Sequence, residues 1–232
     1  MGANAPAHTA PASASASGSR SNATGTRSLL RWGIIVGPFY LGLGLIQALV
    51  RDGFDLARHP LSLLANGPGG WVQTANFVVS GAMVIAAAVG FARVLRPQSR
   101  AAGWILGIHG AGMLAAAVFR ADPVDGFPPG TPEGFPTAVS TAGLLHFIAG
   151  GITFLALAIS CFVVGRALSR RNDSWMARLS FLSGVAVASG FFGPFFLPIP
   201  TGPTAAIWFA VVVGWTWLAL ASLHLYRGVA NG

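Results

Sequence analysis

Long runs without a charged residue constrain this chain more than any other feature. Trp32 to Val50 and Ala101 to Phe119 are each 19 residues long, are flanked by arginines, and contain no Asp, Glu, Lys or Arg. A helix needs about 20 apolar residues to cross the hydrocarbon core of a bilayer. With 53% hydrophobic and only 9% charged residues, the chain lies outside the range of soluble domains. We therefore expect an integral membrane protein.

The remaining uncharged stretches divide into four further spans. Residues 59–92 and 134–165 also lack Asp, Glu, Lys and Arg. Residues 179–226 are too long for one helix, and Pro198, Pro200 and Pro203 divide them because proline ends helices. The predicted fold class is all-α, a polytopic bundle of six transmembrane helices, with spans at about 32–50, 71–92, 101–119, 141–165, 179–197 and 205–225.

The first 27 residues differ in composition from the rest of the chain. Residues 1–27 are rich in Ala, Ser, Pro and Gly and show no apolar periodicity, which predicts a disordered tail. The six-helix membrane domain is predicted over residues 28–232. The first apolar run is long enough to span the bilayer and no small-residue cleavage site follows it, so we expect it to remain as the first helix.

Arginine placement predicts the orientation in the membrane. If the N-terminus is inside, the cytoplasmic segments carry eleven arginines and one acid, Asp173, whereas the outer loops carry three arginines and five acids. This asymmetry follows the positive-inside rule, so both termini are predicted to be cytoplasmic and the protein to be a multi-pass protein of the inner (plasma) membrane. Topology also accounts for the net charge of +8, so the predicted partner is the lipid bilayer and not a nucleic acid.

Two outer loops carry most of the acidic residues. In the first, Pro60 favours the start of a short helix at Leu61–Asn66 lying at the outer interface, with an irregular surface loop as the alternative. The second loop is rich in proline and glycine and is predicted to lack regular structure. Asp-Gly-Phe occurs at residues 52–54 and again at 125–127, which indicates either a duplicated two-helix hairpin or a chance match.

Polar side chains inside the spans are the main functional clue, because they are costly in a bilayer. They gather toward the outer ends of the spans, and His109 lies about ten residues, or roughly 15 Å of helix, below Arg120. This distribution predicts an outward-facing polar pocket with the acidic loops at its mouth. For the histidines, the alternative is a neutral ring hydrogen-bonded to a neighbouring helix. The predicted ligand-binding residues are His59, His146, His109, Asn76, Gln47, Arg58, Asp122 and Asp125.

A metal site is a second interpretation of the same residues. Zinc binds histidine nitrogen and carboxylate oxygen, and a catalytic zinc needs three protein ligands and one open position. His59, His109, His146 and Asp122 supply these residue types. The chain has no His-Glu-x-x-His motif and no histidine pair four residues apart, so zinc remains an alternative cofactor without a motif behind it.

Three segments resemble a known family. They are RHPLSLLANGPGGWVQTANFVVSG, FRADPVDGFPPGTP and LLHFIAG, and together with the six spans they resemble the bacterial membrane-protein family called domain of unknown function 998, over about residues 30–228. The resemblance implies a six-helix integral membrane fold and no assigned activity. The matching positions are His59, Pro60, Ser62, Asn66, Gly67, Asp122, Pro123 and His146.

A more distant resemblance is to alkaline-ceramidase-like membrane hydrolases, which hold a zinc ion with histidines and keep a serine and an aspartate nearby. His109 followed by Asp122 is similar to one half of that arrangement. The paired histidines of a late helix are absent, and six spans are predicted where that group has seven.

The functional prediction from the sequence is the binding, sensing or transport of a small or amphiphilic ligand. One alternative is a zinc-dependent intramembrane lipid hydrolase. The other is a structural or assembly partner that forms an oligomer through glycine seams with small-xxx-small spacing, Gly33 with Gly37 and Gly103 with Gly107.

Overall fold

The computed structural model describes residues 12–134, 136–197 and 202–230, and within these residues the regular structure is entirely helical. Six helices are long and apolar enough to cross a bilayer, which confirms the predicted fold class. Their bounds are α1 (Ala12–Val50), α2 (Gly70–Leu95), α3 (Ala101–Val118), α4 (Thr141–Ser169), α5 (Ser174–Phe192) and α6 (Gly202–Ala230), with short 3-10 helices η1 (Leu61–Ala65) and η2 (Gly193–Phe195).

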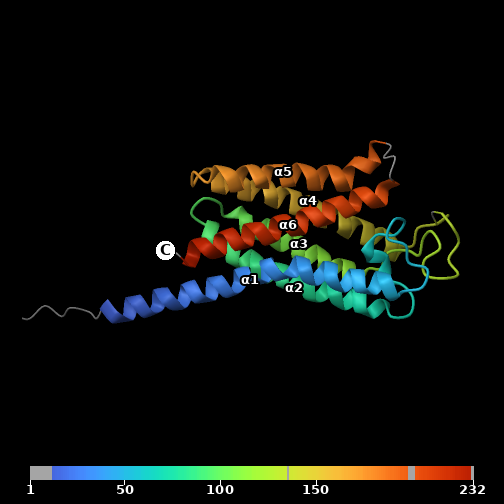
Figure 1. Ribbon diagram of the computed structural model, residues 1–232, viewed down its shortest axis with the longest axis horizontal. Helices are drawn as coiled ribbons and strands as arrows, with labels where there is room; N and C mark the ends of the chain where they lie inside the picture. Colours follow the sequence, from blue (N-terminus) through green and yellow to red (C-terminus); the bar gives the residue numbers. More distant parts are fainter. Residues whose placement is uncertain (1–11, 135, 198–201, 231–232) are drawn as a thin grey trace, which may run out of the picture.

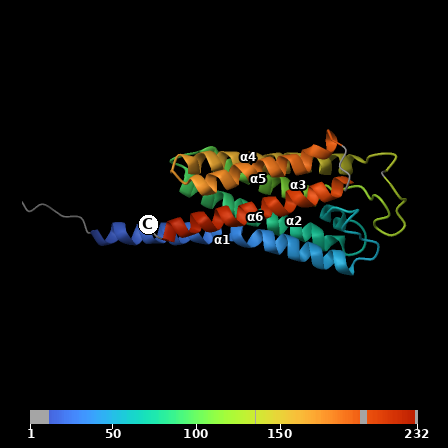
Figure 2. The same cartoon turned by 45° about the horizontal axis from the view of Figure 1, so that its top comes forward.

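The six helices form a closed ring of antiparallel neighbours (Figures 1 and 2). Each helix packs against the one before it in the chain, and α6 returns to pack against α1. The α1–α2 connection (51–69), the α3–α4 connection (119–140) and η2 lie at one end, which we call the loop end. The α2–α3 and α4–α5 turns and the end of α6 lie at the opposite end.

Small residues let these helices approach closely. A Cβ atom added to Gly33 of α1 would lie 2.1 Å from Ser222 Oγ of α6, and one added to Gly103 of α3 would lie 2.4 Å from Ala92 Cβ of α2. Such distances leave no room for a side chain, so glycine is needed at both positions. Gly33 and Gly103, two of the glycines predicted to form seams between copies, therefore pack against other helices of the same chain.

Helix α1 starts well before the predicted span. It begins at Ala12, so the predicted span 32–50 is the C-terminal part of a longer helix, and residues 12–27 of the predicted tail are helical. Alanine has the highest helix propensity, and extending an existing helix is far easier than starting one. The prediction of disorder for residues 1–11 lies outside the described residues.

Two arginines of α1 fasten it to the last helix at the end opposite the loop end. Arg27 Nη2 donates a hydrogen bond of 2.8 Å to the hydroxyl of Tyr226 in α6, and Arg31 Nη2 donates one of 3.0 Å to the same oxygen. The Arg27 guanidinium also stacks 4.5 Å from the centre of the Tyr226 ring, a favourable cation–π contact. The ring of helices is thus closed by polar contacts as well as by packing.

Candidate functional site

An ion-pair cluster joins the two large connections of the loop end. Arg58 donates from Nε to Asp125 Oδ2 at 2.9 Å and from Nη2 to Asp125 Oδ1 at 2.7 Å, and it also pairs with Glu133. The backbone N–H of Gly134 adds a bond of 3.0 Å to Asp125 Oδ1. The hydrogen bonds from Arg58, and then that from Gly134, lower the pKa of Asp125 to about 2. The same pairing raises the pKa of Arg58.

His59 is buried at the centre of this cluster. The backbone N–H of Asp55 donates to His59 Nδ1 at 2.9 Å, so the ring hydrogen is on Nε2, which donates to the carbonyl oxygen of Asp125 at 2.9 Å. The ring packs against Phe54 and Phe127, with ring centres 5.3 and 5.6 Å away. Because both ring nitrogens are engaged, His59 has a structural role and does not line the cavity described below.

The two Asp-Gly-Phe copies meet at this point. Phe54 and Phe127 pack edge to face with ring centres 5.1 Å apart. Gly53 and Gly126 have φ angles of +77° and +85°, a region that favours glycine because it has no Cβ atom. The repeated tripeptide forms a tight turn in each connection, with φ of +55° at Asp125 but not at Asp52, and the two turns contact each other.

The α1–α2 connection is held down onto α6 as well. Thr204 Oγ1 donates to the carbonyl oxygen of Arg58 at 2.9 Å, and Trp208 Nε1 donates to that of Leu56 at 3.0 Å. The predicted short helix at Leu61–Asn66 is present as η1, and its leucines are buried against α1 and α2. Arg51 fixes the end of η1 by donating to the carbonyl oxygens of Leu64 in η1 and of Asn66, which follows it.

Beneath these connections lies a cavity of about 950 Å³, bounded by all six helices. Its wall is mainly apolar, where the sequence predicted a polar pocket. This aromatic wall was not predicted from the sequence. Phe147 and Phe154 lie two turns apart on one face of α4, and their spacing of seven residues is the sequence pattern that indicates a shared face. The aromatic residues lining the cavity are Tyr40, Phe77, Phe147, Phe154, Phe191, Phe195 and Trp208.

Four of the eight predicted ligand-binding residues line this cavity: Arg58, Asp122, Asp125 and His146. His146 Nδ1 donates to the carbonyl oxygen of Phe119 at 2.8 Å, so the neutral ring keeps Nε2 as an acceptor. Asp122 Oδ2 accepts the backbone N–H of Ser140 at 2.9 Å, beside the start of α4. Both residues thus lie where α4 begins, next to the loop end.

The other predicted residues lie in the packed interior. His109 Nδ1 donates to the carbonyl oxygen of Thr153 at 3.1 Å, and the ring packs against Trp215. Gln47 Nε2 donates to Gln73 Oε1 at 2.9 Å. These residues and Asn76 therefore join neighbouring helices, which is the alternative that the sequence left open for the histidines.

Asn76 completes that contact between α1 and α2. Its Nδ2 donates to the carbonyl oxygen of Tyr40 at 3.0 Å and to Gln73 Oε1 at 3.2 Å. Ser80 Oγ in turn donates to Asn76 Oδ1 at 3.2 Å. The chain of amides pairs several buried polar atoms, for which an unpaired state is costly, although Gln47 Oε1 and Gln73 Nε2 find no partner in the described part of the chain.

The residues predicted as zinc ligands do not form one site. His59, His109 and His146 each use Nδ1 in a separate hydrogen bond, on three different elements. Asp122 lies beside Gly143 at the start of α4. Across residues 12–134, 136–197 and 202–230, no three His, Cys, Asp or Glu residues are placed to hold a metal ion. The arrangement of these four side chains therefore does not fit a zinc ion.

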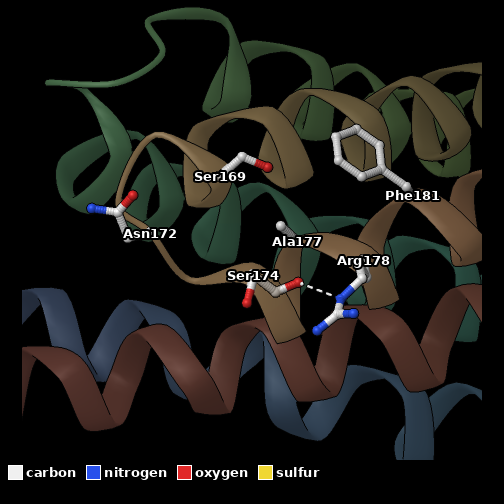
Figure 3. A pocket seen from close by; sticks show the side chains of 6 residues that line it. All are labelled: Ser169, Asn172, Ser174, Ala177, Arg178 and Phe181. Atoms are coloured by element: carbon white, nitrogen blue, oxygen red, sulfur yellow. Dashed lines mark hydrogen bonds between the residues drawn. The ribbon is translucent and has the colours of Figure 1, made fainter.

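A smaller cavity of about 270 Å³ lies at the opposite end, around the α4–α5 turn (Figure 3). Two of its polar side chains bond within their own helices: Arg178 Nε donates to the carbonyl oxygen of Ser174 at 3.2 Å (Figure 3), and Ser169 Oγ donates to that of Gly165 at 3.0 Å. Because its volume is below the roughly 300–1,000 Å³ typical of small-molecule sites, the small cavity is the weaker candidate for a ligand site.

Comparison with known proteins gives one match. The family model described as "Protein of unknown function (DUF998)" matches residues 34–224, which is more than half of the chain. No curated protein and no solved structure matches the chain. The functional argument therefore rests on the geometry of the large cavity.

Proposed function

The chain belongs to the DUF998 family of membrane proteins of unknown function, and we propose that it binds an amphiphilic molecule taken up from the bilayer. Binding is the step that sensing and transport of such a molecule share. The observation that carries the proposal is the cavity of about 950 Å³, which lies at the upper end of the roughly 300–1,000 Å³ typical of small-molecule sites. Its wall is apolar and aromatic, and its polar groups lie near the loop end.

The side of the cavity formed by α4 and η2 supports access from the lipid. Leu144, Phe147 and Phe195 line the cavity and are 51%, 56% and 56% exposed. Aromatic pairs bridge the two elements: Phe147 and Phe195 have ring centres 5.7 Å apart. We infer that these exposed apolar side chains mark a lateral opening, through which an apolar chain enters from the bilayer without crossing water.

The polar groups set the orientation of the bound molecule. The loop end carries Arg58, Asp122 and Asp125 on the cavity wall. A head group at this end keeps polar contacts, while its apolar chain lies among the aromatic residues of α4, α5 and α6. This is the arrangement expected at a bilayer interface, where one end of a molecule is apolar and the other is hydrated.

The arginine distribution supports a location for the site. The end opposite the loop end carries eleven arginines, and the loop end carries three arginines and five acids. By the positive-inside rule, the loop end then faces outward and both termini face the cytoplasm, in the inner (plasma) membrane. The cavity would take its ligand from the outer leaflet.

A cavity-filling pair of variants tests the proposal. A Cβ atom added to Gly150, which lines the cavity, would meet one atom, Phe191 Cζ at 3.9 Å. A Cβ atom at the adjacent Gly151 meets no described atom within 4 Å, and this residue does not line the cavity. Gly150→Leu therefore fills the cavity, and Gly151→Leu is the matched control with the same change in composition.

The probe is a long-chain alcohol with a photoactivatable diazirine in its tail, added to the protein in lipid nanodiscs. We expect crosslinking to map to α4, α5 and α6 residues that line the cavity and to be displaced by excess unlabelled alcohol. Gly150→Leu should remove this labelling, and Gly151→Leu should retain it. Equal labelling of the two variants, or labelling confined to the outer surface of the bundle, would overturn the proposal.

A further inference from the structure

One carboxylate on the cavity wall has no basic partner. The ion pairs among the described residues are Arg58 with Asp125, Arg58 with Glu133, and His224 with Asp173. Asp122 takes part in none of them, although it lines the cavity. Its only hydrogen bond within the described part of the chain comes from the backbone of Ser140 to Oδ2. Oδ1 is therefore available to a ligand.

We propose that the bound amphiphile carries a positively charged head group, a long-chain amine or quaternary ammonium, and that Asp122 provides its counter-charge. This inference rests on the proposed function and names the class of ligand. A negative group next to an apolar cavity attracts a cation strongly, because the local dielectric is lower than that of water.

The positive group on the described part of the cavity wall is already paired with carboxylates. Arg58 is the one arginine among the described residues that line it, and its Nε and Nη2 are already bonded to Asp125 and Glu133. An anionic head group at Arg58 would lie beside the two carboxylates that this arginine already holds, whereas Asp122 has no basic partner among the described residues.

The neighbouring groups also suit a cation. Asp122 lies against Gly143, and His146 follows one helical turn later on α4. With Nδ1 donating to Phe119, the neutral His146 ring presents Nε2 as an acceptor, which can receive an N–H from a long-chain amine but not from a quaternary ammonium. Beyond it lies Phe77, whose ring centre is 6.5 Å from that of His146, and aromatic faces attract cations at such sites.

The charge of the loop end acts in the same direction. Its two connections carry three arginines and five acids, so the surface through which a head group approaches is negative overall. Such a field raises the local concentration of cations and lowers that of anions.

The test compares three probes that share one diazirine-bearing tail and differ only in the head group: trimethylammonium, hydroxyl or sulfonate. Each is crosslinked to the full-length protein in nanodiscs of zwitterionic lipid, and the concentration for half-maximal labelling of cavity residues is measured. Asp122→Asn removes the charge but keeps an oxygen that can accept from Ser140. Asp52→Asn is the control, because Asp52 is an exposed acid of the same loop end that does not line the cavity.

We expect the trimethylammonium probe to label the cavity at about tenfold lower concentration than the alcohol, and the sulfonate to be the weakest. Asp122→Asn should abolish the preference for the cation and leave labelling by the alcohol unchanged, and Asp52→Asn should retain the preference. If the alcohol labels the cavity but the cation has no advantage, or both variants respond alike, this inference fails while the proposed function stands. If no probe labels the cavity, both fail.

Discussion

Replacing Gly112 by alanine should destabilise the contact between α3 and α4, by an amount that follows from the distances across it. A Cβ atom at Gly112 would lie 2.0 Å from Thr153 Oγ1 and 3.1 Å from Thr153 Cβ. Favourable contacts between heavy atoms occur at about 3.5–4.0 Å. The two helices must therefore separate, or Thr153 must change its rotamer at the cavity wall, and overpacking of this kind typically costs about 1–3 kcal/mol.

A second substitution, at Thr153, should relieve the clash. Thr153 Oγ1 is buried and has no hydrogen-bond partner in the described part of the chain, so Thr153→Ala removes an unsatisfied polar atom and should itself cost little. In the double variant the nearest remaining atom of residue 153 is Cβ at 3.1 Å, which a shift of a few tenths of an ångström accommodates. The double variant should recover most of the loss, a coupling of about 1–2 kcal/mol between the two positions.

The stabilities of the parent, Gly112→Ala, Thr153→Ala and the double variant are compared by unfolding them in mixed micelles with increasing dodecyl sulfate. The fluorescence of the seven tryptophans reports the unfolding. Gly151→Ala serves as the control, since a Cβ atom there meets no described atom within 4 Å. The reasoning is refuted if Gly112→Ala unfolds at the same point as the parent. It is also refuted if the double variant is as unstable as Gly112→Ala alone.

Two further predictions concern the ion pair of Asp125 and the orientation of the two ends of the bundle. Arg58 lowers the pKa of Asp125 from 3.8 to about 2. The ionised Asp125 side chain therefore stabilises the folded protein above about pH 4, and this contribution is lost as the pH falls through about 2. The difference in thermal unfolding between the parent and Asp125→Asn should therefore shrink over that window, and a constant difference would contradict it. For topology, a membrane-impermeant thiol reagent should label Thr137→Cys in intact cells and Ser174→Cys only after permeabilisation. The buried Cys161 should stay unlabelled, and the reverse pattern would overturn the orientation.

The sequence was sufficient for the spans because their signal is local. Arg31 and Arg51, for example, bound the uncharged run of α1, and no contact elsewhere in the chain alters that pattern. The start of α1 was not predicted, since alanine and serine are compatible with a tail and with a helix that continues from a neighbouring span.

The hydrogen-bond partners of the buried polar residues could not be predicted from the local sequence. His109 and His146 were correctly placed on the helices, but their partners are the backbone oxygens of Thr153 and Phe119, which are 44 and 27 residues away in the chain. Any residue type provides a backbone oxygen, so composition carries no signal for such a bond. Gln47 similarly bonds to Gln73, and the polarity that predicted a pocket instead joins two helices.

Closure of the ring by α6 has a consequence for how the protein is made. The bond between Arg31 and Tyr226 joins residues 195 positions apart, and membrane helices insert in the order of synthesis before they pack. The face of α1 that receives α6 stays open to lipid through the insertion of the four intervening helices. Ile207, Trp208 and Val211 of the cavity wall arrive only with this last helix. A nascent chain thus lacks this part of the cavity wall until its final span is in place, so the proposed ligand would find its complete site only once all six helices have been inserted.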